Sequence, residues 1–114
     1  MKLKHKSKHD VNDIIDKLYD EIDETMRKRL VEPDMGFMPD EIDEYFYIEI
    51  DEENVSDGYG EDHNAIKVEV RGEMGYEGMD DLAEALNPVV QRYDKDAYFD
   101  HDSSGIISAY IFNF

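Results

Sequence analysis

The chain has no cysteine and no tryptophan, and only 12 of its 114 residues are Lys or Arg. The absence of cysteine excludes disulfide bonds, thiolate metal sites and cysteine nucleophiles. No apolar run approaches the roughly eighteen residues that a membrane-spanning helix requires. Because 30 residues are Asp or Glu, the formal net charge is −18. These absences indicate a soluble, strongly acidic chain whose length fits one domain.

Signals of enzymatic chemistry are also missing. The sequence contains no GxxxxGK(S/T), GxGxxG or GxSxG motif. Its acidic residues fall on polar faces or in loops, whereas a catalytic carboxylate pair needs a partly apolar cleft that separates the two pKa values. With 40% hydrophobic and 11% aromatic residues the chain can nevertheless fold, because disordered acidic tails carry few aromatics. We therefore expect a folded protein that is not an enzyme and holds no cofactor, apart from one weak calcium motif.

The charge is divided unevenly along the chain. Residues 1–31 carry eight basic and seven acidic side chains, whereas residues 32–114 carry four basic and 23 acidic ones. The first nine residues, MKLKHKSKH, lack the apolar segment of a secretory signal. We interpret residues 1–9 as a flexible basic N-terminal arm and residues 10–114 as a single acidic domain. We expect the protein in the cytoplasm.

Two segments have the three- and four-residue spacing of apolar residues that is typical of amphipathic helices. Residues 10–31 begin with Asp10 as a possible N-cap and end in a basic turn, which suits the helix dipole. Residues 79–93 contain Pro88, which either kinks this helix or begins a second one capped by Asn87. The apolar positions of the first helix are Val11, Ile14, Ile15, Leu18, Ile22, Met26 and Leu30.

Four segments predict β-strands. Residues 45–51 and 65–71 alternate strictly between apolar and polar side chains, as half-buried strands do. The long polar loop between them contains the turn signal Asp57-Gly58. Residues 97–101 and 106–112 are rich in β-forming residues and flank a second turn. The order helix, strand, strand, helix, strand, strand predicts an α+β two-layer sandwich, with a four-stranded antiparallel sheet and two helices on one face.

Two connections complete this arrangement. Residues 32–43 contain two prolines and a glycine, which interrupt any regular pattern. Residues 72–78 contain three glycines and predict a flexible link between strand and helix.

The segment from Asp100 to Gly105 has the strongest chemical pattern. Oxygen-bearing side chains at its first, third and fifth positions, with glycine at the sixth, match the start of an EF-hand calcium loop. The twelfth position is Ile111, where such loops need a bidentate Glu. Two interpretations stay open: a weak calcium site formed by Asp100, Asp102 and Ser104, and the favoured one, a β-turn whose side chains bond their own backbone.

The outward row of the first predicted strand contains both tyrosines and acids. Alternate positions on one face lie about 6.7 Å apart, and tyrosine is enriched at protein interfaces. Residues 40–62 contain eleven acidic residues and no Lys or Arg. The row is either an interface or a solvated sheet face, and we predict a partner-binding surface there. Its predicted residues are Tyr45, Tyr47, Glu49, Asp51, Glu52, Glu53, Asp57, Tyr59, Glu61 and Asp62.

The charge predicts the class of partner. Nineteen net negative charges over residues 32–114 repel nucleic acid and favour a basic protein surface. Eighteen charges equal those on roughly 31 Å of duplex DNA, which is about the size of the protein. We therefore predict a non-enzymatic binding or inhibitor protein, a DNA mimic that occupies a nucleic-acid-binding surface of its partner. By analogy, phage and mobile-element proteins that counter restriction or CRISPR nucleases often act this way.

Two other functions stay open, and neither involves a membrane. One is a small calcium-binding or regulatory domain that uses the hairpin at residues 100–105. The other is a structural or assembly subunit, a monomer or homodimer that pairs through its tyrosine-rich sheet face. A salt-adapted or generally acidic proteome would also explain the charge without any basic partner.

Overall fold

The computed structural model describes residues 8–31, 38–56 and 62–112. Residues 1–7 of the predicted basic arm lie outside these ranges, and the first helix begins two residues earlier than predicted, at Lys8. The chain forms the helices α1 (Lys8–Leu30), α2 (Pro39–Tyr45) and α3 (Tyr76–Gln91) and the strands β1 (Phe46–Ser56), β2 (Asp62–Gly72), β3 (Asp100–Ser103) and β4 (Ile106–Ile111).

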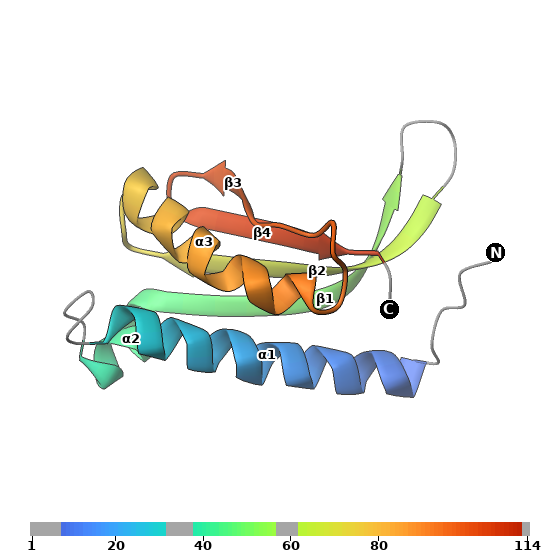
Figure 1. Ribbon diagram of the computed structural model, residues 1–114, viewed down its shortest axis with the longest axis horizontal. Coiled ribbons are helices and arrows are strands. Elements are labelled where there is room, and N and C mark those ends of the chain that lie inside the picture. Colours follow the sequence, from blue (N-terminus) through green and yellow to red (C-terminus); the bar gives the residue numbers. More distant parts are fainter. Residues whose placement is uncertain (1–7, 32–37, 57–61, 113–114) are drawn as a thin grey trace.

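The four strands form one antiparallel sheet in the order β1-β2-β4-β3. Ile48 of β1 pairs with Val70 of β2, which pairs in turn with Ile107 of β4. In an antiparallel pair, directly opposite residues point to the same face of the sheet. These aliphatic residues therefore form one continuous stripe, and α1 and α3 cover it (Figure 1). The predicted α+β two-layer sandwich is confirmed.

The helical spacing of α1 places its apolar residues on the core as predicted. Leu18, Ile22 and Leu30 are fully buried, and Ile14 and Ile15 pack against the core with part of their surface exposed. The opposite face of this helix is charged, which leaves it in water. Within the described ranges, no helix is both long and apolar enough to cross a membrane.

Pro88 does not divide the second predicted helix, because α3 runs through it from Tyr76 to Gln91. Proline removes the hydrogen bond to the carbonyl four residues earlier, which belongs to Glu84. Glu84 and Pro88 are exposed, so water can reach that carbonyl. Asn87 begins no new helix; its Oδ1 accepts a hydrogen bond of 2.7 Å from the backbone N–H of Phe99.

The predicted connection at residues 32–43 is partly wrong, because its end belongs to α2. Pro39 lies in the first turn of this helix, where its missing N–H costs nothing. The side chain of Glu41 accepts a hydrogen bond of 2.9 Å from the backbone N–H of Met38. Seven residues are too few to produce a helical apolar period, so only this capping pattern marked the helix. Residues 32–37 lie outside the described part of the chain.

The last hairpin begins later than its sequence indicated. β3 starts at Asp100, whereas residues 97–101 were predicted as the strand. Ala97 and Phe99 are buried, but the segment that holds them is irregular. Ala97 and Phe99 are buried because they pack against the core. The hydrogen bond from the backbone N–H of Phe99 to Asn87 holds this segment, which pairs with no strand of the described sheet.

Gly72, at the end of β2, offers a test of the core geometry. A Cβ there would lie 2.5 Å from the ring of Phe46, its cross-strand partner, and 3.1 Å from Sδ of Met79. We expect Gly72→Ala to lower the free energy of unfolding by about 1–3 kcal/mol, because the buried ring must move. The measurement is urea unfolding.

Gly75→Ala is the control, because a Cβ at Gly75 meets nothing within 4 Å. Gly75 is the N-cap of α3, where alanine is less favourable than glycine, so this change should lower the free energy of unfolding by less than about 1 kcal/mol. Equal effects of the two substitutions would show that the packing of Phe46 over Gly72 is incorrect.

Candidate functional site

The helices cover one face of the sheet and leave the other, here called the open face, to solvent (Figure 1). Its side chains are those that alternate with the buried aliphatic residues along each strand. Their positions follow from the strand register. The open face contains Tyr47, Glu49, Asp51 and Glu53 from β1, Ala65, Lys67, Glu69 and Arg71 from β2, Ile106, Ser108 and Tyr110 from β4, and Asp100 and Asp102 from β3.

An acidic row lies along the first edge of the open face. Glu49, Asp51 and Glu53 occupy alternate positions of β1, and all three are exposed. Tyr47 begins the same row and is 57% exposed. We call these four residues the β1 row. Because β1 is an edge strand, no further strand of the described sheet shields the row from a partner.

A second pair of acids lies at the opposite edge. Asp100 is directly opposite Ser108, which is opposite Glu69, so all three share the open face. The hydroxyl of Ser108 donates a hydrogen bond of 2.8 Å to Oδ2 of Asp102, which places this carboxylate on the same face. Asp100 and Asp102, both exposed, are called the β3 row. Three strand spacings of about 4.8 Å place the two rows about 14 Å apart.

The centre of the open face holds one acid and two cations. Glu69 is only 8% exposed, and its carboxylate lies 2.7 Å from Nε of Arg71 and 3.7 Å from Nζ of Lys67. The hydrogen bond from Arg71 to Glu69 raises the pKa of Arg71 above its usual value. Burial by itself lowers the pKa of Lys67, but the ionisable groups around it, Tyr110 first among them, outweigh burial and raise that pKa. Two cations thus offset the buried acid between the rows and leave the centre with one net positive charge.

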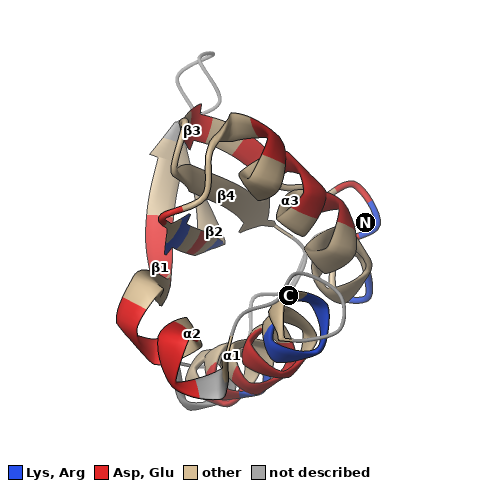
Figure 2. Cartoon of the chain, turned by 90° about the vertical axis from the view of Figure 1, so that its left-hand side faces the viewer, with Lys and Arg blue, Asp and Glu red and all other residues tan. Residues whose placement is uncertain are grey.

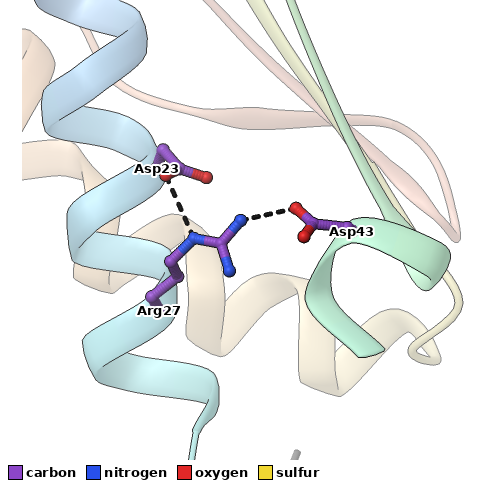
Figure 3. A network of polar contacts seen from close by, with 3 residues as sticks. All are labelled: Asp23, Arg27 and Asp43. Atoms are coloured by element: carbon purple, nitrogen blue, oxygen red, sulfur yellow. Dashed lines mark hydrogen bonds and ion pairs between the residues drawn. The ribbon is translucent and has the colours of Figure 1, made fainter. Parts of the chain in front are cut away.

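Arg27 and Arg29, near the end of α1, also form internal ion pairs. Arg27 joins α1 to α2, with Nε 3.0 Å from Asp23 and Nη2 2.5 Å from Asp43 (Figure 3). These hydrogen bonds raise the pKa of Arg27. Arg29 pairs with Asp81 of α3 at 3.3 Å. Arg27 and Arg29 therefore link α1 to the other two helices, while acidic residues occur on α1, α2, β1, α3 and β3 (Figure 2).

The structure places the predicted partner-binding residues in different surroundings. Tyr47, Glu49, Asp51 and Glu53 lie on the open face. Glu52 is also exposed, but it lies between two residues of this row and belongs to the other face of the strand. The predicted place of Tyr45 in the strand is wrong: it is the last residue of α2 and packs, half-buried, against the core. The remaining predicted residues, Asp57, Tyr59 and Glu61, lie outside the described chain, and Asp62 begins β2.

The β3 row was not part of the predicted surface. Its acids were noticed in the sequence only as possible calcium ligands. Whether Asp100 shares a face with Glu49 depends on the strand order β1-β2-β4-β3, which is a long-range property. The one local signal was the alternation of the polar Ser108 with the apolar Ile107 and Ala109, although Ser108 is itself only 6% exposed.

The turn that follows β3 uses its side chains locally. Oδ1 of Asp100 accepts a hydrogen bond of 2.9 Å from the backbone N–H of His101, and Asp102 accepts one from Ser108. In the part of the chain that the structure describes, no three His, Asp or Glu side chains are grouped to hold a metal ion. Calcium binding by Asp100, Asp102 and Ser104 stays a prediction.

Comparison of the chain with protein-family models, curated proteins and solved structures gives no match. Function must therefore be inferred from the open face itself. Two exposed acidic rows can attract and orient a basic surface.

The calcium hypothesis makes a direct prediction. If Asp100, Asp102 and Ser104 bind calcium, millimolar calcium should raise the melting temperature, because a ligand that binds only the native state stabilises it. Asp102→Asn should remove the increase, and Asp16→Asn on α1 should leave it unchanged. A melting temperature of the unmodified protein that calcium does not change would contradict the site.

Proposed function

We propose that this chain is a non-enzymatic binding protein whose open face occupies a basic, nucleic-acid-binding surface of another protein. The observation that carries the proposal is the pair of exposed acidic rows on β1 and β3, at the two edges of the sheet. Such a face attracts cationic side chains over distances of about a Debye length and binds them along the β1 row and the β3 row.

The dimensions of the open face support a DNA mimic. The rows lie about 14 Å apart, and the major groove of B-DNA is about 12 Å wide between its phosphate backbones. Within the β1 row, Glu49, Asp51 and Glu53 repeat about every 6.7 Å. A protein that binds duplex DNA through cations on both sides of a groove would meet carboxylates of similar spacing on the open face. Restriction and CRISPR nucleases are partners of this class.

Charge also favours a different protein over a second copy of the chain. In an antiparallel pairing of two β1 edges, Glu49, Asp51 and Glu53 of each copy would approach like charges of the other. Acidic residues on an edge strand are a known means of preventing such pairing. With a net charge of −18 per chain, the open face is unsuited to self-association.

The first test uses salt. A binding reaction led by long-range charge slows as ionic strength rises, because the Debye length falls from about 30 Å at 0.01 M to about 8 Å at 0.15 M. We expect the association rate constant for the partner to fall at least tenfold between about 50 and 300 mM salt. A rate constant that stays the same over this range would contradict the proposal.

The second test reverses charge in two matched places. Immobilised protein should capture basic proteins from source-cell extract, and added duplex DNA should displace them. Glu49→Lys with Asp51→Lys should weaken binding of the captured partner about a hundredfold or more, because juxtaposed like charges cost several kcal/mol. Both side chains are exposed, so the fold should survive.

Asp16→Lys with Asp20→Lys makes the same change in net charge on exposed positions of α1. This control should weaken binding less than about fivefold, since it alters the overall field but not the open face. If the α1 pair is the more damaging, or if both pairs bind normally, the open face is not the contact surface.

A further inference from the structure

A cavity of about 300 Å³ lies on the open face beside the β3 row. It is bounded by the segment before β3, by β3 itself and by β4. Its volume is at the lower end of the range for ligand sites, so it fits one side chain better than a larger molecule. The residues that define it are Tyr98, Asp100, Asp102, Ser108, Tyr110 and Phe112.

Buried polar groups fix the walls of this cavity. Asp94 is 8% exposed, and its two carboxylate oxygens accept hydrogen bonds from the backbone N–H groups of Asp96, at 3.1 Å, and Phe112, at 3.0 Å. Asp94 thereby joins the segment before β3 to the end of β4. The bond from Phe99 to Asn87 fastens the same segment to α3. The cavity is therefore formed before any ligand arrives, which reduces the entropy cost of binding.

The lining combines carboxylates with aromatic rings. Asp96, Asp100 and Asp102 supply negative charge, and the hydrogen bonds described above use one oxygen each of Asp100 and Asp102. Tyr98 is 60% exposed. Rings of Tyr110 and Phe112 stack with their centroids 6.2 Å apart. Negative charge beside aromatic faces selects a cation.

A guanidinium group fits this combination better than an ammonium group. It is planar, stacks on aromatic rings and donates two parallel hydrogen bonds to one carboxylate. One of these rings already contacts a cation of the protein itself. Nζ of Lys67, in the centre of the open face, lies 5.7 Å from the centroid of the Tyr110 ring.

We infer that the cavity beside the β3 row binds the side chain of an arginine that the partner protein presents. The source of the arginine rests on the proposed function, whereas the affinity of the cavity for a guanidinium group does not. An arginine anchored here would fix the register of a basic surface on the open face, as buried arginines do at the centre of interfaces.

The experiment titrates the ¹⁵N-labelled protein with N-acetyl-arginine methylamide and follows backbone amide shifts. Saturable shifts should be confined to the cavity walls, residues 96–102 and 108–112. N-acetyl-lysine methylamide should bind at least about fivefold more weakly, because its ammonium cannot stack. Tyr98→Ala should also weaken arginine binding about fivefold or more, which is the usual size of a cation–π contribution.

Tyr47→Ala is the matched control, since Tyr47 is similarly exposed, at 57%, but lies in the β1 row. It should leave arginine binding unchanged. Shifts that do not saturate, equal affinity for the lysine analogue, or an equal loss in Tyr47→Ala would each overturn the cavity assignment.

Two further outcomes separate this inference from the proposed function. If the cavity binds capped arginine while Glu49→Lys with Asp51→Lys leaves partner capture intact, the guanidinium site stands and the proposed docking of the open face fails. If Tyr98→Ala abolishes capped-arginine binding but leaves partner capture unchanged, the assignment to an arginine of the partner is overturned. Loss of both capped-arginine binding and partner capture in Tyr98→Ala supports the inference.

Discussion

The alternation of side chains along paired antiparallel strands is the constraint on which the rest of this structure depends. Because successive residues point to opposite faces, the pairing of Ile48 with Val70 and Ile107 builds the core and at the same time fixes the open face. A slip of one residue would bury Glu49 and expose Ile48. The apolar residues that stabilise the sheet therefore also determine where its acids lie.

A chain with 30 acids and 12 basic residues must also limit its own repulsion. The described ion pairs place scarce cations where elements meet, with Arg27 between α1 and α2 and Arg29 between α1 and α3. Glu69, the acid buried in the middle of the sheet, forms ion pairs with both Lys67 and Arg71. Repulsion is thus reduced inside the fold, and the surplus negative charge is exposed on the helices and at the sheet edges.

Local periodicity was sufficient to predict the parts of the fold that bury an amphipathic face. The spacing of Leu18, Ile22 and Leu30 predicted α1, and the alternation around Ile48 predicted β1. Features set by contacts distant in sequence were missed. The short helix α2 has no apolar period, and Ala97 and Phe99 alternate in burial without belonging to a strand.

The same division applies to the candidate site. Glu49 and Asp51 were placed on one face by local alternation alone, and the structure agrees. Tyr45 was misplaced because α2 ends at Tyr45 and β1 begins at the next residue, Phe46. Asp100 and Asp102 join the same face only through the strand order, and the cavity beside them depends on the long-range bonds of Asp94 and Asn87.

The central claim is that a partner binds the open face across both acidic rows. The most direct measurement is the footprint of the captured partner on the amide spectrum of the ¹⁵N-labelled protein. The largest shifts and line broadening should fall on residues 47–53 of β1 and on residues 96–102, and the exposed faces of α1 and α3 should be spared. A footprint on the helices, with both rows unaffected, would contradict the account.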